Sequence, residues 1–302
     1  MIKVEQVSKQ LDGKQIVDKV SFQVAQGEVV GLLGPNGAGK TTMIRLMNGV
    51  ITPNQGSITI DGLNAAVSGN EIRQLSGVVT ESAGLYPDMS ARENLAFFAQ
   101  LYGIKSAKER IEILLEQFQL AEHGNKQVGD FSTGMKKRLA IAKALLHKPK
   151  LLFLDEPTNG LDPDGIRDMI GYLQQLNREQ GTTIIICSHV LYQLEDICTS
   201  FLFLERGRII EKGTLNELEQ RYSGTVILQV ETGVHASAPE LPVAYQARTS
   251  GHGQLEFTLP DKRAIPDLLR LLLQFSWVYT VRIANRNLES IYFEVRRRYH
   301  EL

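Results

Sequence analysis

Cysteine is scarce in this sequence. Only Cys187 and Cys198 occur among its 302 residues, and Cys187 closes an apolar run that begins at Thr182. Cysteines in such settings are typical of buried, reduced thiols rather than of a disulfide framework. We therefore expect two free thiols and a cytoplasmic location.

Long apolar runs are missing as well. Segments such as Leu151 to Leu154 and Ile184 to Cys187 fall far short of the ~20 residues that span a bilayer. Residues 1–10 alternate polar and apolar side chains and hold no apolar core of signal-peptide length. The sequence therefore predicts a chain that cannot itself form a pore.

An excess of charge of one sign is also absent. The chain carries 33 Lys and Arg against 34 Asp and Glu, a formal net charge of -1. No chain-wide positive field would hold a polyanion, so we expect no nucleic-acid partner.

The alternation of elements indicates the fold class. Short β-rich runs alternate with helical patterns up to about Tyr222, which is typical of an α/β domain on a mainly parallel sheet. The full length exceeds the ~100–200 residues of one domain, so we expect a large domain, residues 1–222, and a small one. The clearest buried strands are Val29 to Leu33, Leu151 to Leu154, Thr183 to Cys187 and Phe201 to Leu204.

Residues 86–149 indicate a helical subdomain inserted between these strands. Ser90 with Glu93 and Ser106 with Glu109 match the capping-box pattern of a helix start. The apolar residues from Leu95 to Tyr102 recur at helical spacing. We expect helices to begin after both serines.

The pattern of apolar and polar residues changes after Tyr222 and predicts a small C-terminal α+β domain over residues 223–302. Strand patterns occur at Val226 to Val230, Leu255 to Leu259 and Trp277 to Ile283. A helix is expected at Leu268 to Phe275, and Asn287 is placed to cap a last helix. This segment shows no catalytic pattern.

A phosphate-binding loop follows the first buried strand. Its residues are Gly34, Pro35, Asn36, Gly37, Ala38, Gly39, Lys40 and Thr41, with a helix expected from Thr42. Glycines let the backbone N–H groups approach phosphates closely, and Lys40 adds a positive charge at the β- and γ-phosphates. The pattern predicts an ATP-binding core of the P-loop NTPase type, with an ordinary glycine-rich turn as the alternative.

Two carboxylates end a second buried strand. Asp155 and Glu156 follow Leu151 to Leu154, at the sheet edge where the phosphate loop also lies. We expect Asp155 and the Thr41 hydroxyl to hold Mg²⁺, Asp155 through water, and Glu156 to activate the attacking water as general base. The alternative is a pair of solvated or helix-capping acids.

His189 emerges from the same sheet edge. It follows the strand Thr183 to Cys187, near the expected γ-phosphate, to which its ring is able to donate a hydrogen bond. The alternative is a structural histidine.

With these motifs, the segment Phe131 to Arg138 resembles the signature motif of ABC transporter nucleotide-binding domains, and the resemblance covers about Ile2 to Tyr222. It implies that Ser132 and Gly134 face the γ-phosphate held by a second subunit. It also implies a head-to-tail, ATP-dependent homodimer bound to a separate transmembrane permease at the inner face of the cell membrane. From the residues alone, Ser132 caps the helix that follows, and Lys136, Lys137 and Arg138 form a solvated face.

Two variants within the signature, Thr133 and Met135, are similar to those of bacterial exporters of antibiotics, ions and lipids. The segment Thr158 to Asp162 is similar to the family's D-loop, which crosses the dimer interface, and Asp162 before Pro163 is equally a plain helix cap. The segment Asn287 to Phe293 resembles part of the small C-terminal domain of export ATPases.

Two positions depart from the family. Leu11 stands where an aromatic ring usually stacks on adenine, and Glu81 stands where the Q-loop glutamine follows a strand. We expect Glu81 either to bind Mg²⁺ or to contact the membrane partner. Export is the leading interpretation, with import and a non-transport regulatory ATPase as alternatives.

Overall fold

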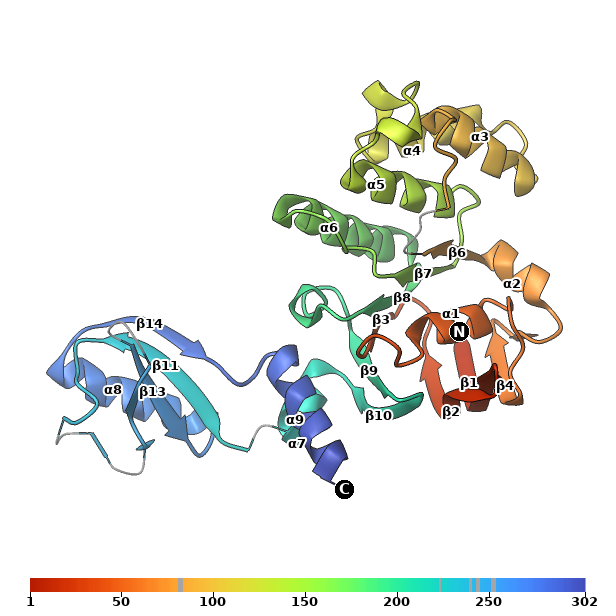
Figure 1. Ribbon diagram of the computed structural model, residues 1–302. Coiled ribbons are helices and arrows are strands. Elements are labelled where there is room, and N and C mark those ends of the chain that lie inside the picture. Colours follow the sequence, from red (N-terminus) through yellow and green to blue (C-terminus); the bar gives the residue numbers. More distant parts are fainter. Residues whose placement is uncertain (81–83, 223, 239–240, 243–244, 251–253, 302) are drawn as a thin grey trace. The chain divides into compact units, whose positions relative to one another are not determined.

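The computed structural model describes residues 1–80, 84–222, 224–238, 241–242, 245–250 and 254–301, in two compact units, residues 1–212 and 213–302 (Figure 1). The two units divide after Lys212, whereas the sequence analysis expected the domains to divide at about Tyr222. The helix α7 (Leu215–Tyr222) belongs to the second unit because it packs against α9 (Leu288–Glu301) there.

A six-stranded sheet organises unit 1. Its strand order is β10-β9-β3-β8-β7-β6, and the pairs β3–β9, β3–β8, β7–β8 and β6–β7 are parallel. Every residue of β3, β7 and β8 is buried, as expected for parallel strands covered on both faces. The strands are β3 (Val29–Leu33), β6 (Ser76–Val79), β7 (Leu151–Asp155), β8 (Thr183–Ser188), β9 (Ser200–Glu205) and β10 (Arg208–Gly213). The four predicted strands and the α/β class are confirmed.

The sequence analysis missed an antiparallel sheet at the start of the chain. Its order is β2-β1-β4-β5, formed by β1 (Ile2–Leu11), β2 (Lys14–Val24), β4 (Gln55–Ile60) and β5 (Leu63–Asn64). One hydrophobic core joins this sheet to the parallel sheet and to α1 (Lys40–Met47), with Val4, Met43 and Phe153 among its members. The phosphate-loop helix is therefore held between two sheets.

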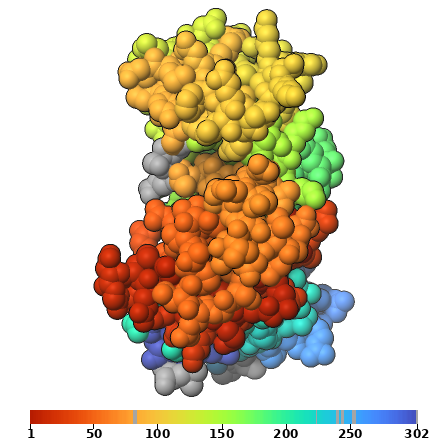
Figure 2. Space-filling model, turned by 90° about the vertical axis from the view of Figure 1, so that its right-hand side faces the viewer, coloured from red at the N-terminus to blue at the C-terminus, as the bar shows by residue number. Residues whose placement is uncertain are grey.

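The expected helical insertion is present. It contains α3 (Ala91–Leu101), α4 (Ala107–Gln117) and α5 (Thr133–Ala144), and unit 1 also holds α2 (Gly69–Leu75) and α6 (Pro163–Gln180). Helices α3 to α5 gather at one end of the unit, opposite β1, β2 and β4 (Figure 1), and Figure 2 shows the same separation in space-filling form. In the part of the chain that the structure describes, no helix is both long and apolar enough to cross a membrane.

The two expected capping boxes have different outcomes. The Ser90 hydroxyl accepts from the Glu93 backbone N–H, and the Glu93 carboxylate accepts from the Ser90 N–H, so this box is confirmed. The box at Ser106 is wrong. Its backbone is left-handed, with φ 56°, and its side chain makes no cap bond, because a capping side chain requires an extended N-cap residue.

Unit 2 is a four-stranded antiparallel sheet with helices. The strand order is β12-β13-β11-β14, formed by β11 (Val226–Thr232), β12 (Arg248–Thr249), β13 (Gln254–Leu259) and β14 (Val278–Ile283). Alternate residues of β11, Val226, Leu228 and Val230, pack with Leu268 and Leu272 of α8 (Ile265–Phe275). The Asn287 side chain accepts from the Ser290 N–H at the start of α9, so the predicted cap is present.

Candidate functional site

The phosphate loop occupies residues 34–39, between β3 and α1. The helix begins at Lys40, two residues earlier than expected, so Lys40, Thr41 and Thr42 form its first turn. The N-cap Gly39 is left-handed, with φ 109°, and no acidic side chain lies in the first turn. The first N–H groups of a helix have no intrahelical partners. This helix start is therefore suited to an anion.

Two glycines of the loop are required by close approach. A Cβ on Gly34 would overlap the carbonyl oxygen of Leu204 in β9, and one on Gly39 would lie 2.9 Å from the carbonyl oxygen of Ile16 in β2. The positive φ of Gly39 adds strain for any other residue. The loop is thus packed between strands of both sheets.

Lys40 and Thr41 bring the loop to the acidic strand end. Lys40 is 6% exposed, and its Nζ donates to the Gly34 carbonyl oxygen at 2.6 Å. The same Nζ lies 3.6 Å from Glu156 Oε1. The Thr41 hydroxyl donates to Asp155 Oδ2 at 2.7 Å. The structure therefore assembles the loop and both carboxylates in one place.

Glu156 and His189 meet at the same sheet edge. Asp155 is the last residue of β7, and Glu156 turns out of the strand with a left-handed φ of 51° while its N–H donates to the Cys187 carbonyl oxygen of β8 at 2.9 Å. His189 follows β8, and its Nδ1 lies 2.9 Å from Glu156 Oε1. Among the described residues Oε1 has no aligned hydrogen-bond partner, so this is a close approach of two atoms. A proton placed between these two atoms would contact both side chains.

Cys187 supports the site through its backbone only. Burial raises the pKa of its thiol well above the ordinary value, and the nearby Asp155 carboxylate raises it further. The thiol therefore stays protonated and is a poor nucleophile. Cys187 and Cys198 are both free, as expected.

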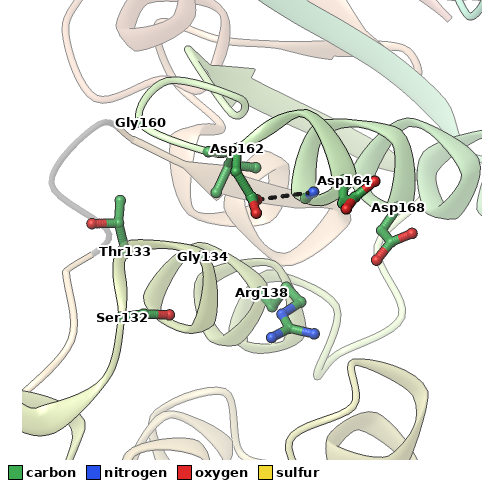
Figure 3. Close-up of a pocket in the computed structure, with 10 residues that line it drawn as sticks. Ser132, Thr133, Gly134, Arg138, Gly160, Asp162, Asp164 and Asp168 are labelled. Atoms are coloured by element: carbon green, nitrogen blue, oxygen red, sulfur yellow. Dashed lines mark hydrogen bonds between the residues drawn. The ribbon is translucent and has the colours of Figure 1, made fainter.

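Ser132 and Gly134 lie in a separate pocket of about 520 Å³ (Figure 3). The start of α5 and the start of α6 line it, and no phosphate-loop residue does. The Ser132 hydroxyl caps α5 by accepting from the Met135 N–H at 3.2 Å, and Asp162 caps α6 by accepting from the Gly165 N–H at 3.1 Å. Both predicted caps are confirmed. Two helix N-termini therefore open on one pocket, apart from the Lys40 site.

The solvated face expected at residues 136–138 is wrong at Lys137. Lys137 is 6% exposed, and its Nζ donates to the Glu156 carbonyl oxygen at 3.2 Å. Lys136 is half-buried, and its Nζ donates to the Gly129 carbonyl oxygen at 3.1 Å. Successive helix residues point about 100° apart, so only one of the two adjacent lysines faces the strand end.

Sequence reasoning missed a second buried contact beside the site. The Thr158 hydroxyl donates to Gln193 Oε1 at 2.5 Å, and both residues are buried. Gln193 lies in a short 3₁₀ turn, Leu191–Gln193, that follows His189. The contact joins the segment after Glu156 to the segment after His189. The signal available in the sequence was that Thr158 and Gln193 are polar residues that closely follow site residues.

The two departures from the family have different positions. Glu81 lies outside the described residues. Leu11 ends β1 opposite Lys14, in the hairpin whose second strand carries Ile16 against Gly39. This hairpin is therefore beside the phosphate loop.

Thr41 and Asp155 suit a magnesium ion that enters with a nucleotide. Among the described residues, no group of three or more His, Cys, Asp or Glu side chains is arranged to hold a metal. Mg²⁺ is usually held by one or two carboxylates together with waters and substrate phosphates. The hydroxyl of Thr41 and the carboxylate of Asp155 supply oxygen ligands of this kind at the phosphate loop.

Comparison with known proteins agrees with this geometry. A family model described as ABC transporter matches residues 17–159. An uncharacterized ABC transporter ATP-binding protein of Bacillus subtilis, YhcH, is 34% identical over 297 residues, which are 98% of this chain and 95% of that protein. The bacitracin transport ATP-binding protein BcrA of Bacillus licheniformis is 42% identical over 221 residues, 73% of this chain and 72% of that protein.

Solved structures are similar over about three quarters of the chain. One, described as the ATP binding subunit of an ABC transporter, has a TM-score of 0.68 at 32% identity and covers 74% of this chain and 93% of that one. Another, the dimeric ATP-binding cassette MJ0796 in a post-hydrolysis state with ADP and Pi, has a TM-score of 0.65 at 25% identity and covers 71% and 98%.

Proposed function

Because the chain belongs to the ABC transporter ATP-binding family, we propose that its ATP hydrolysis powers export through a separate membrane-spanning permease. The observation that carries the proposal is the meeting of Lys40, Thr41, Asp155, Glu156 and His189 at the carboxyl ends of β3, β7 and β8. The chain then works from the cytoplasm, at the inner face of the cell membrane.

Each residue of this cluster has a chemical role in phosphoryl transfer to water. The loop N–H groups and Lys40 bind the β- and γ-phosphates and offset the charge that builds on the transferred group. Glu156 accepts a proton from the attacking water, and His189 donates to a γ-phosphate oxygen. Thr41 and Asp155 hold Mg²⁺, which when bound neutralises charge on the phosphate oxygens.

A second copy of the chain completes the site in this proposal. Ser132 and Gly134 present the N-terminus of α5 from a pocket apart from Lys40, so they are free to face the γ-phosphate bound by another subunit. The dimeric cassette among the similar structures supports a homodimer, and the head-to-tail arrangement is part of the proposal. Relatives named for bacitracin transport, linearmycin resistance and Nod factor export support export as the coupled process.

Replacement of Glu156 by Gln tests the proposed hydrolysis. The amide cannot take a proton from water, so turnover should fall by ~10²–10⁴-fold, while ATP still binds and the dimer accumulates. Phosphate release and size-exclusion chromatography measure the two effects. Lys40→Ala is the matched control, and it should weaken ATP binding itself, as measured by calorimetry. Near-wild-type turnover of Glu156→Gln would remove Glu156 from the role.

The same variant tests the membrane partner. Tagged Glu156→Gln, purified with ATP from detergent-solubilised membranes of the cells that make it, should carry a multi-span protein in about equal amount. Retrieval of the chain alone, in an ATP-bound dimer, would argue for a regulatory ATPase instead.

A further inference from the structure

A buried lysine touches the backbone of the proposed general base. Lys137 lies in the second turn of α5, and its Nζ donates to the carbonyl oxygen of Glu156 at 3.2 Å. The residue is 6% exposed, so this ammonium has left bulk water to make the contact. Burying a charge is costly unless it is hydrogen-bonded, so the position is set by its partners and not by solvation.

The carbonyl that Lys137 contacts lies at an unusual point in the backbone. The strand β7 ends at Asp155, and Glu156 adopts a left-handed φ of 51°, which costs conformational free energy in any residue with a Cβ. Its N–H is held by the Cys187 carbonyl oxygen, and its own carbonyl accepts from the Asn159 N–H at 3.3 Å as well as from Lys137. Both backbone polar groups of Glu156 are therefore fixed, the N–H by β8 and the carbonyl partly by α5.

This backbone turn decides where the Glu156 carboxylate lies. It brings Oε1 to 3.6 Å from Lys40 Nζ and 2.9 Å from His189 Nδ1. A base must lie within hydrogen-bond reach of the water that it activates, and small displacements reduce the rate steeply. A contact that holds the peptide also holds the base.

We propose that Lys137 is a positioning residue that holds Glu156 in its catalytic orientation, an inference that rests on the proposed hydrolytic role of Glu156. Because Lys137 and Ser132 lie on one helix, the contact also links the helix start that faces the partner's nucleotide to the base of the same chain. A movement of α5 on dimerisation is thereby transmitted to Glu156.

Lys137→Met tests the proposal, since it keeps an unbranched apolar stem and removes the donor. The kcat for ATP should fall on the order of 10- to 100-fold, while KM and ATP affinity stay within about twofold because Lys40 is untouched. Lys136→Met is the matched control from the neighbouring position, where the Nζ donates to the Gly129 carbonyl oxygen instead, and it should leave kcat unchanged. Thermal melts of each variant show whether the fold is intact.

The double variant Lys137→Met/Glu156→Gln shows whether Lys137 acts by positioning Glu156 or by stabilising the site in general. If Lys137 acts through the Glu156 carboxylate, adding Lys137→Met to Glu156→Gln should not slow the residual single-turnover rate further. A loss of the same size in both backgrounds would overturn the proposal, as would wild-type kcat in folded Lys137→Met. Should that variant not fold, Lys137→Gln, whose donor is one bond shorter, should show the same kcat loss, and normal turnover there would likewise overturn it. Absence of hydrolysis in the wild-type chain would instead reject the proposed function.

Discussion

Replacement of Leu11 tests nucleotide affinity without altering the catalytic cluster. It ends β1 in the hairpin that packs against the phosphate loop through Ile16 and Gly39. If the base lies here, Leu11→Tyr should tighten ATP binding by about 1 kcal/mol, or about fivefold, because an aromatic ring stacks on a base where leucine does not. Calorimetry measures the change. Val67→Tyr, at a site 82% exposed, is the control, and equal affinities for both variants would place the base elsewhere.

The adjacent residues Lys136 and Lys137 have different environments, and the spacing of apolar residues in the sequence indicated this difference. Lys137 is in phase with Ile141 and Ala144, at spacings of four and seven, and those positions are buried on α5. A lysine on an apolar stripe indicates a buried ammonium that needs an acceptor. The acceptor itself, the Glu156 carbonyl, was not predictable because it depends on how α5 docks on the end of β7.

Helix starts are the element-scale feature that sequence patterns describe only in part. Ser90 and Ser106 both precede a Glu by three residues, yet only Ser90 has the extended backbone that lets its hydroxyl reach the helix. The left-handed turn at Ser106 comes from the loop before it, which a capping pattern does not contain.

This difference provides a matched pair for measuring helix capping. Ser90→Ala should lower the free energy of unfolding by about 0.5–2 kcal/mol, because the Glu93 N–H loses its acceptor. Ser106→Ala should change it by much less, since no cap bond is lost. Urea denaturation at constant m-value measures both. Equal losses of unfolding free energy in the two variants would show that the capping hydrogen bond of Ser90 does not stabilise the protein.

The antiparallel sheet escaped prediction for a reason specific to its strands. The strand β1 pairs with β2 through three irregularities in register, and the alternation of apolar and polar residues that begins at Ile2 breaks at Gln6. By contrast, β3, β7 and β8 are wholly buried and read as plain apolar runs. The parallel sheet and the site at its edge were therefore predictable.

At the scale of the whole molecule, the boundary between the two units depends on how the helices pack and not on amino-acid composition. The polar helix α7 follows the large domain in composition, but its one buried side chain, Leu218, lies in the unit that also holds α9. The sequence pattern therefore indicates that α7 is a helix, but the unit to which it belongs depends on its packing against α9.

The arrangement of the complete site can be decided by mixing inactive chains. In a head-to-tail dimer of Lys40→Ala with Ser132→Arg, one site collects both lesions and the other combines Lys40 of one chain with Ser132 of its partner. Hydrolysis should therefore reappear in heterodimers isolated by two different tags. The reciprocal control pairs a wild-type chain with one that carries both lesions. There each shared site has one lesion and should be inactive, whereas sites built within single chains would give the opposite pair of results.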